Sequence, residues 1–282
     1  MPRVIFGRVR DDQEAGDVVI AMITLSGRGV PRSSPLRATL ADIADVEEAE
    51  VELSRSEGGR VFSVGEWMLA TTAIPQPIPW SELEGPAATA FWWPEATVML
   101  RKHKAHLLMA LMRTPEMSPL ERRLAMTRLV AAALPNSDAT GVYWGEGTLV
   151  YPPGQWRKAA NAATLDSPPV QLWVDVRVEP LDDKHIRCFT TGRTAFGLPE
   201  MEVPSTTANP DLVYGLIGDT TTYQITTGAV IKSGETIGHD AETRFPVTEG
   251  PSMFDRDPVL RIDMGGGSGG GLLGKLKGLF GR

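Results

Sequence analysis

The chain has 282 residues, of which 42% are hydrophobic and 22% charged, and its formal net charge at pH 7 is −7. This length and composition predict a soluble protein of two domains, each with a buried core. The acidic balance argues against general nucleic-acid binding, which needs a basic surface. The single cysteine, Cys188, excludes a disulfide within the chain.

The first 16 residues are charged and lack the apolar core of a signal peptide. The longest clean apolar run, residues 18–23, is too short to span a bilayer. We therefore expect a cytoplasmic protein.

The first predicted domain covers residues 1–115 and shows the element order strand, helix, strand, strand, helix, strand. The expected elements are a strand at 17–25, a helix from about 34, two strands within 60–74, a proline-broken helical stretch at 81–102 and a strand at 105–112. A proline-rich connector, "PQPIPW", follows the two strands and excludes helix there. This order is the βαββαβ order of a ferredoxin-like fold.

The second predicted domain covers residues 116–264 and begins with the most clearly marked helix. In "SPLERRLAMTRLVAAALP", Ser118 and Glu121 form a capping box, Pro119 takes the first helical position and Pro135 ends the helix. The same element order then repeats. Its expected elements are a strand within 140–151, a helix at 154–164, two strands within 170–192, a helix at 209–228 and a last strand at 258–264. The sequence thus predicts an α+β protein with two tandem ferredoxin-like halves.

Two histidines, His103 and His106, stand three residues apart in "HKAH". On a helix they would share one face, as metal-ligating pairs do. On a strand, which the neighbouring residues favour, they point to opposite faces and make hydrogen bonds at a strand edge.

The segment "TTGRTAFGLPEMEV" (residues 190–203) is the densest unusual stretch. Gly192 and Gly197 permit tight turns, and Glu200 and Glu202 form a Glu-x-Glu pair that suits a metal pair or an acid and a base. The alternative is a loop that packs on the sheet and leaves both acids in water.

The motifs that mark common enzyme classes are absent from the sequence. There is no GxxxxGK[ST] phosphate loop, dinucleotide fingerprint, HExxH, GxSxG or CxxC motif. The sequence therefore predicts no cofactor and no metal site, and it favours a protein that is not an enzyme.

Several stretches together resemble a known family. The stretches are "FWWPEA", "HKAHLLMAL", "VYWGEG", "VQLWVDV", "TTGRTAFGLPEMEV" and "SGETIG". As a set, spread over residues 16–264, they resemble an uncharacterised bacterial family, the domain of unknown function numbered 4261. The resemblance implies a soluble bacterial protein of a family without an established activity. It places six residues in the family's pattern: His103, His106, Gly192, Gly197, Glu200 and Glu202.

The C-terminus combines a glycine- and serine-rich linker, residues 265–271, with an amphipathic segment, residues 272–282. On a helical wheel the apolar side chains share one side, two lysines flank them and glycines lie opposite. Eleven residues with three glycines are too few for a stable isolated helix, so we expect weak, reversible docking. The residues expected to dock are Leu272, Leu273, Leu276, Leu279, Phe280, Lys275 and Lys277.

The leading hypothesis is a non-enzymatic binding or adaptor protein that docks through residues 272–282 into the apolar groove of a partner protein. One alternative is a peripheral protein that the same segment anchors to an anionic membrane surface. The segment is also able to fold back on its own acidic chain. A further alternative is an enzyme, a hydrolase or a metal-dependent one, with a site near His103, His106, Glu200 and Glu202.

Overall fold

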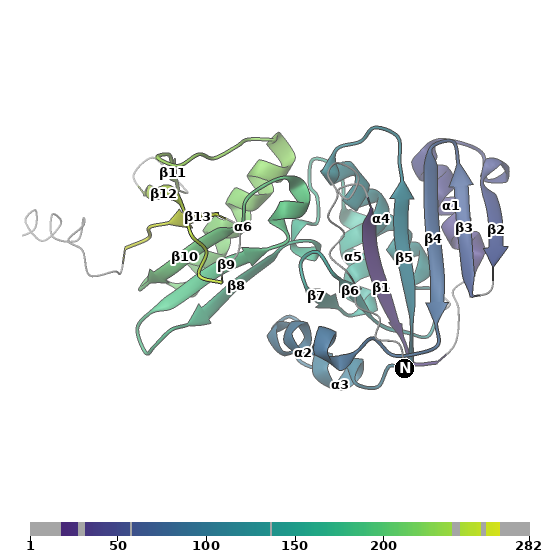
Figure 1. Cartoon of the computed structure of the whole chain (residues 1–282), viewed down its shortest axis with the longest axis horizontal. Coiled ribbons are helices and arrows are strands. Elements are labelled where there is room, and N and C mark those ends of the chain that lie inside the picture. The colour runs from purple at the N-terminus through teal and green to yellow at the C-terminus, as the bar shows by residue number, and fades with distance from the viewer. Residues whose placement is uncertain are drawn as a thin grey trace, which may run out of the picture. The chain divides into compact units, whose positions relative to one another are not determined.

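The computed structural model describes residues 18–27, 32–56, 58–135, 137–238, 243–254 and 258–265. The chain divides into two compact units, residues 1–169 (unit 1) and 170–282 (unit 2). Each unit contains a sheet and at least one helix packed on it, so the predicted α+β class is confirmed (Figure 1). None of the described helices is long and apolar enough to cross a membrane.

Unit 1 is built on a seven-stranded sheet with the order β2-β3-β4-β5-β1-β6-β7, in which all neighbouring strands are antiparallel. The two central strands, β1 and β5, have the most apolar sequences, VIAMITL and AHLLMALMR. The strands are β1 (Val19–Leu25), β2 (Glu52–Ser56), β3 (Gly59–Val64), β4 (Trp67–Ile74), β5 (Ala105–Arg113), β6 (Ala139–Trp144) and β7 (Leu149–Tyr151).

One face of this sheet, the inner face, is covered by three helices that lie behind the strands in Figure 1. The helices are α1 (Ser33–Ala44), α4 (Pro119–Ala133) and α5 (Pro153–Ala162). The capping box predicted for α4 is confirmed, since the Glu121 backbone N–H donates to Ser118 Oγ at 3.2 Å and the Ser118 N–H donates to Glu121 Oε2 at 2.8 Å. The buried rings of Trp144 and Trp156, 5.8 Å apart, join α5 to β6.

Two short helices, α2 (Trp80–Thr89) and α3 (Ala96–Leu100), pack on part of the opposite, outer face. Their buried side chains form a cluster with Tyr143 of β6 and Val150 of β7. Gly141 makes this approach possible, because a Cβ atom there would lie 2.8 Å from the Leu100 side chain and 3.0 Å from that of Trp93.

Unit 2 has a six-stranded sheet with the order β11-β12-β13-β10-β9-β8, in which β10 and β13 are parallel. Its long helix, α6 (Pro210–Thr227), begins and ends as predicted: the Asn209 side chain accepts from the Asp211 N–H at 2.8 Å, and Gly228 follows with φ 70°. The core includes Cys188, which is fully buried. The strands are β8 (Asp175–Pro180), β9 (Ile186–Thr191), β10 (Met201–Thr206), β11 (Thr236–Ile237), β12 (Phe245–Gly250) and β13 (Val259–Ile262).

The division between the units does not fall at the predicted boundary, residues 115/116. Strand β6 pairs with β1, and β7 pairs with β6, so the segment after α4 continues the first sheet. The ferredoxin-like order is not confirmed either. A split βαβ motif holds a strand between the two parallel strands that a helix connects, whereas β4 and β5, joined through α2 and α3, pair directly and antiparallel.

Candidate functional site

The two histidines singled out in the sequence hold the proline-rich connector that joins β4 to α2. His103 Nε2 accepts from the Ile78 backbone N–H at 2.8 Å, and its Nδ1 contacts the Leu100 carbonyl oxygen. Because a carbonyl only accepts, Nδ1 carries the proton and both ring nitrogens are used. His106 Nδ1 donates to the Gln76 carbonyl oxygen at 2.8 Å. Both side chains are buried, so the interpretation as hydrogen-bonding residues fits their contacts better than metal ligation does.

The burial of His106 leads to a prediction about pH. Burial lowers the pKa of His106 below its ordinary 6.5, and nearby His103 also lowers it, although the hydrogen bond to Gln76 raises it. The folded state therefore favours the neutral ring, which stabilises unit 1 above pH 6.5, and this stability is lost as pH falls through the folded-state pKa. Thermal unfolding is measured at pH values from 7.5 down to 5. We expect the melting temperature of the His106→Asn variant to fall less steeply with decreasing pH than that of the native chain. His185→Asn, in the β8–β9 turn, serves as the control. Equal slopes for native chain and His106→Asn would contradict this role.

Glu200 lies at the centre of a ring of donors formed by the end of β9 and the turn η3 (Arg193–Phe196). Its Oε1 accepts from the backbone N–H groups of Gly192 at 2.8 Å and Arg193 at 3.0 Å, and its Oε2 accepts from the Thr190 hydroxyl at 2.6 Å. Gly192 has φ 110°, a conformation that favours glycine. The expectation that this acid stands in water is wrong, because its side chain is buried and fully hydrogen-bonded.

Arg193 is the residue of this segment that sequence reasoning missed. It is fully buried and donates from Nε to the Pro199 carbonyl at 2.8 Å, from Nη1 to Thr221 Oγ1 at 2.7 Å and from Nη2 to Gln224 Oε1 at 2.7 Å. Burial lowers the pKa of Arg193 to about 10, and the charge of Glu200 acts in the opposite direction. The guanidinium is thus still charged at neutral pH and ties η3 to α6. The sequence feature that indicates this role is the position of the arginine between two turn glycines.

Glu202 belongs to a separate network. Its Oε1 accepts from the Ser252 hydroxyl at 2.5 Å and its Oε2 from the Met253 N–H at 2.9 Å, and it is 1% exposed. The two glutamates therefore do not share a ligand or a proton. In the part of the chain that the structure describes, no group of three His, Cys, Asp or Glu residues is placed to hold a metal ion.

The predicted enzyme residues are thus divided between the units: His103 and His106 make these hydrogen bonds within unit 1, and Glu200 and Glu202 within unit 2. The docking residues expected at 272–282 lie outside the described residues, so that part of the hypothesis stays a prediction.

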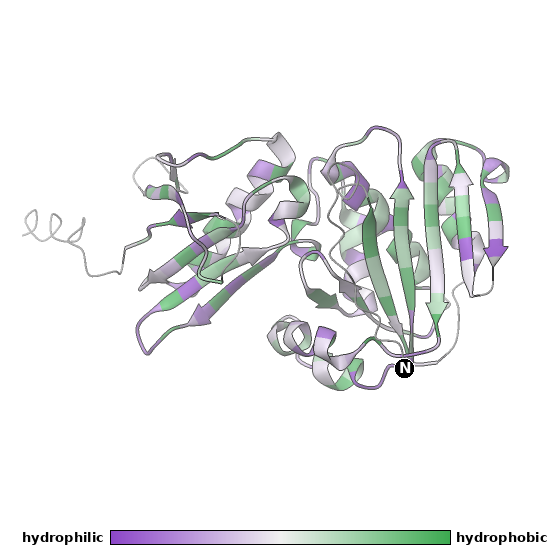
Figure 2. Ribbon diagram, in the orientation of Figure 1, coloured by the Kyte–Doolittle hydropathy of each residue, from purple (hydrophilic) through white to green (hydrophobic). Residues whose placement is uncertain are grey.

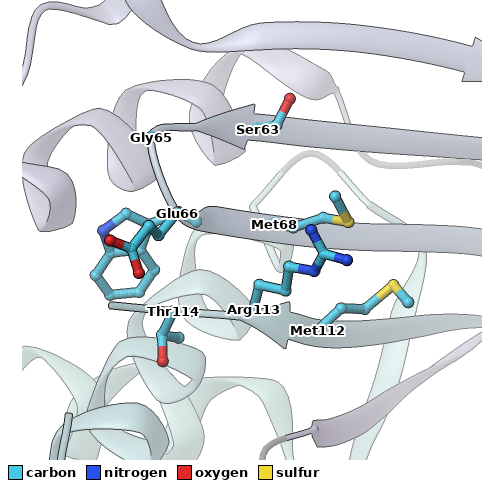
Figure 3. A pocket seen from close by; sticks show the side chains of 8 residues that line it. Ser63, Gly65, Glu66, Met68, Met112, Arg113 and Thr114 are labelled. Carbon is cyan, nitrogen blue, oxygen red and sulfur yellow. The ribbon is translucent and has the colours of Figure 1, made fainter. Parts of the chain in front are cut away.

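A shallow cleft of about 360 Å³ lies at the end of strands β3, β4 and β5. Figure 3 shows the Arg113 side chain extending from β5 toward Met68 on β4. Met112 lies beside Arg113, and Glu66 lies in the turn that joins β3 to β4. Neither histidine nor cysteine lines it. The cleft opens at one corner of a larger apolar surface.

That surface is the half of the outer face of unit 1 that α2 and α3 leave uncovered, and no helix lies in front of β3, β4 and β5 in Figure 1. A row of apolar side chains crosses four strands in register: Val61 pairs with Ala70, Ala70 with Ala110, and Ala110 with Ile20. Ile20 is 41% exposed and Met112 43%, and the remaining members are partly exposed. We define the outer apolar face as Ile20, Val61, Met68, Ala70, Leu108, Ala110 and Met112.

When one face of an antiparallel sheet is exposed to solvent, each strand normally alternates apolar and polar residues. Strands β1 and β5 do not alternate, and Figure 2 shows both as almost continuously hydrophobic. The missing alternation was therefore the sequence feature that could have revealed a second apolar face.

The family model of a domain of unknown function, DUF4261, matches residues 189–263 of this chain. The predicted resemblance is confirmed for this segment, which contains Gly192, Gly197, Glu200 and Glu202 but neither His103 nor His106. Neither a curated protein nor a solved structure matches the chain.

Proposed function

We propose that this chain, which carries the DUF4261 match in its second unit, is a non-enzymatic cytoplasmic binding or adaptor protein. Its recognition surface is the outer apolar face of unit 1, and the C-terminal segment 272–282 is a second docking element. The observation that carries the proposal is the solvent-facing apolar row Val61, Ala70, Ala110 and Ile20.

The size of the outer apolar face indicates what kind of partner fits it. Strands lie about 4.8 Å apart and outward side chains repeat about every 6.8 Å along a strand, so each outward residue covers about 33 Å². Seven such residues cover about 230 Å² by the same geometry. A typical globular partner needs about 800 Å² on each side. The face therefore suits a single peptide segment or helix.

The burial and hydrogen bonding of three of the four candidate catalytic residues, His103, Glu200 and Glu202, support a binding role over the enzyme alternative. A general base or metal ligand needs a lone pair that is free for substrate or metal. Both nitrogens of His103 are used in hydrogen bonds within the protein, and the carboxylates of Glu200 and Glu202 are buried and accept hydrogen bonds on both oxygens, so these three side chains do not present a lone pair to solvent.

Site-specific photo-crosslinking tests the proposal. Benzoylphenylalanine placed at Met112 of the full chain should give specific cross-linked peptides, identified by mass spectrometry, at least five-fold above the level from the same group at Leu165. Leu165 is a matched control because it is also an exposed apolar residue of unit 1, 47% exposed against 43% for Met112. Equal, non-specific cross-linking from the two positions would reject the recognition surface. Flotation with anionic vesicles, lost when residues 266–282 are deleted, would favour the membrane alternative.

A further inference from the structure

We infer that the partner segment bound by the outer apolar face is an amphipathic helix of another protein, with an acidic residue beside its apolar stripe that pairs with Arg113. The inference rests on the proposed function, because it names the chemistry of the partner at the same recognition surface. All the residues that carry it belong to unit 1.

The backbone of the strands under this face disfavours an extended partner. In the order β2-β3-β4-β5-β1-β6, each of the strands β3, β4, β5 and β1 has a paired neighbour on both sides. Their backbone N–H and C=O groups are used within the sheet, so an extended segment laid on the face would bury its own polar backbone groups without partners. A helix satisfies those groups internally. It is therefore the form of chain that can bury an apolar side on this face.

The outer side of unit 1 already packs helices. Helices α2 and α3 cover β6 and β7 and reach β1, whose Met22 packs against their cluster. Leu108 of β5 is the register partner of Met22 and belongs to the uncovered half. A partner helix over β4 and β5 would therefore extend a helical layer that is already present on this face.

The side chains of the face favour large apolar residues on the partner. Ala70 and Ala110, register partners on neighbouring strands, place two small side chains at its centre. Larger apolar side chains surround them: Ile20, Val61, Met68, Leu108 and Met112. Leucine or phenylalanine side chains of a helix would pack over the two alanines, and the methionines can adapt to their shape.

A β-bulge brings Arg113 onto this side of the sheet. The register partner of Leu69 is Leu111. The partner of Met68, one residue earlier in β4, is Arg113 and not Met112, so β5 contains an extra residue here. In a regular strand Arg113 would point to the same side as buried Leu111, because side chains alternate. The bulge instead sets it opposite Met68, toward which its side chain extends in Figure 3.

Arg113 stands at one end of a row that has opposite charges at its two ends. The row crosses four strands in register: Glu52, Ser63, Met68 and Arg113. Glu66 lines the same cleft from the turn that joins β3 to β4. All three charged side chains are exposed, and among the described residues neither Arg113 nor Glu66 forms an ion pair. A partner with one carboxylate near Arg113 is therefore favoured, whereas a uniformly acidic partner would meet Glu52 and Glu66.

This chemistry separates the partner from the chain's own C-terminal segment. No acidic residue follows Asp263 in the sequence. The segment 272–282 therefore has no carboxylate for Arg113, and the occupant is a helix of another protein. Methionine and arginine, which meet at this corner of the face, are enriched in protein–protein interfaces.

A scan with model peptides tests the inference. The probes are fluorescent helical peptides of about 18 residues, with leucines at the spacing i, i+4, i+7 and i+11 and alanine or glutamine elsewhere. Each probe carries a single glutamate beside the leucine stripe, placed one turn further along from probe to probe, and the parent peptide carries none. In titrations of the full chain, we expect one glutamate position to tighten binding about two- to five-fold over the parent, the upper range for an exposed ion pair.

Variants of the protein assign this gain. Arg113→Gln should abolish it, while binding of the parent peptide stays the same, and Arg113→Lys should retain part of it. Arg128→Gln is the matched control, because Arg128 is also an exposed arginine of unit 1 but lies on α4, in the helical layer of the inner face. The control should leave the gain unchanged. A proline at the centre of the best probe breaks its helix and should weaken binding at least ten-fold.

The carboxylate is rejected if no glutamate position tightens binding, or if the gain survives Arg113→Gln. Equal binding of the proline probe would overturn the helix. If no probe binds while position 112 still gives specific cross-links to another protein, the inference is wrong and the proposed recognition surface stands. Specific cross-links to a segment of this same chain have the same meaning. Absence of both peptide binding and specific cross-links overturns the inference and the proposed function together.

Discussion

Replacing Arg193 with alanine is expected to destabilise unit 2 by about 3–5 kcal/mol, because it empties a fully buried site and breaks three hydrogen bonds at once. The buried side chains of Thr221 and Gln224 and the partly buried carbonyl of Pro199 lose their donor. Each unsatisfied buried group costs about 1–3 kcal/mol. Hydrogen–deuterium exchange of peptides from η3 and α6, together with urea unfolding, measures the loss within unit 2.

Arg187→Ala is the matched control for this variant. Arg187 also pairs with a carboxylate, Glu179 at 2.7 Å, but the two side chains are 32% and 30% exposed. Water screens such a pair, so its loss should cost less than about 1 kcal/mol. Arg193→Lys should recover only part of the loss, because an ammonium group does not reproduce the geometry of the three donors. If Arg193→Ala and Arg187→Ala lose equal stability, the assigned role of Arg193 is wrong.

The second large effect is expected in unit 1, at Trp156. This side chain is fully buried, packs against Trp144 and donates from Nε1 to the Thr127 carbonyl oxygen of α4 at 3.2 Å. Trp156→Ala removes a fully buried indole ring between α4, α5 and β6 and should cost about 3–5 kcal/mol. Denaturant unfolding with exchange of peptides from α4 and α5 measures it.

Two variants bracket the Trp156 result. Trp156→Phe keeps an aromatic ring but loses the indole donor, so we expect an intermediate loss of stability. Phe91→Ala removes an aromatic ring that is 70% exposed and should change stability by less than about 0.5 kcal/mol. A Trp156→Ala variant as stable as Phe91→Ala would contradict the packing described for α5.

Local features of the fold could be predicted from the sequence. The capping box of Ser118 and Glu121 and the Asn209 cap of α6 are each set by residues within a few positions of one another. The extent of unit 1 could not be predicted in this way. It depends on β6 pairing with β1, in which Thr24 lies opposite Gly141, and no local pattern indicates a partner so distant in sequence.

The candidate site shows the same limit. The Glu-x-Glu spacing was visible in the sequence. The burial of Glu200, however, depends on backbone donors from Gly192 and Arg193, which the fold of η3 brings close to the start of β10. Both histidines make hydrogen bonds, as the strand interpretation expected, but His103 lies before β5 and not in it. Their partners Gln76 and Ile78 follow from how the proline-rich connector lies against β5. In both places the residue types were evident and the tertiary contacts were not.

The burial of Cys188 has a practical consequence. Burial raises the pKa of this thiol to about 12, so the folded chain presents no sulfur nucleophile at neutral pH. An alkylating dye or spin label will therefore react with an exposed cysteine introduced on either unit and not with Cys188. Distance measurements between such positions can be made on the natural background, without first removing a native thiol.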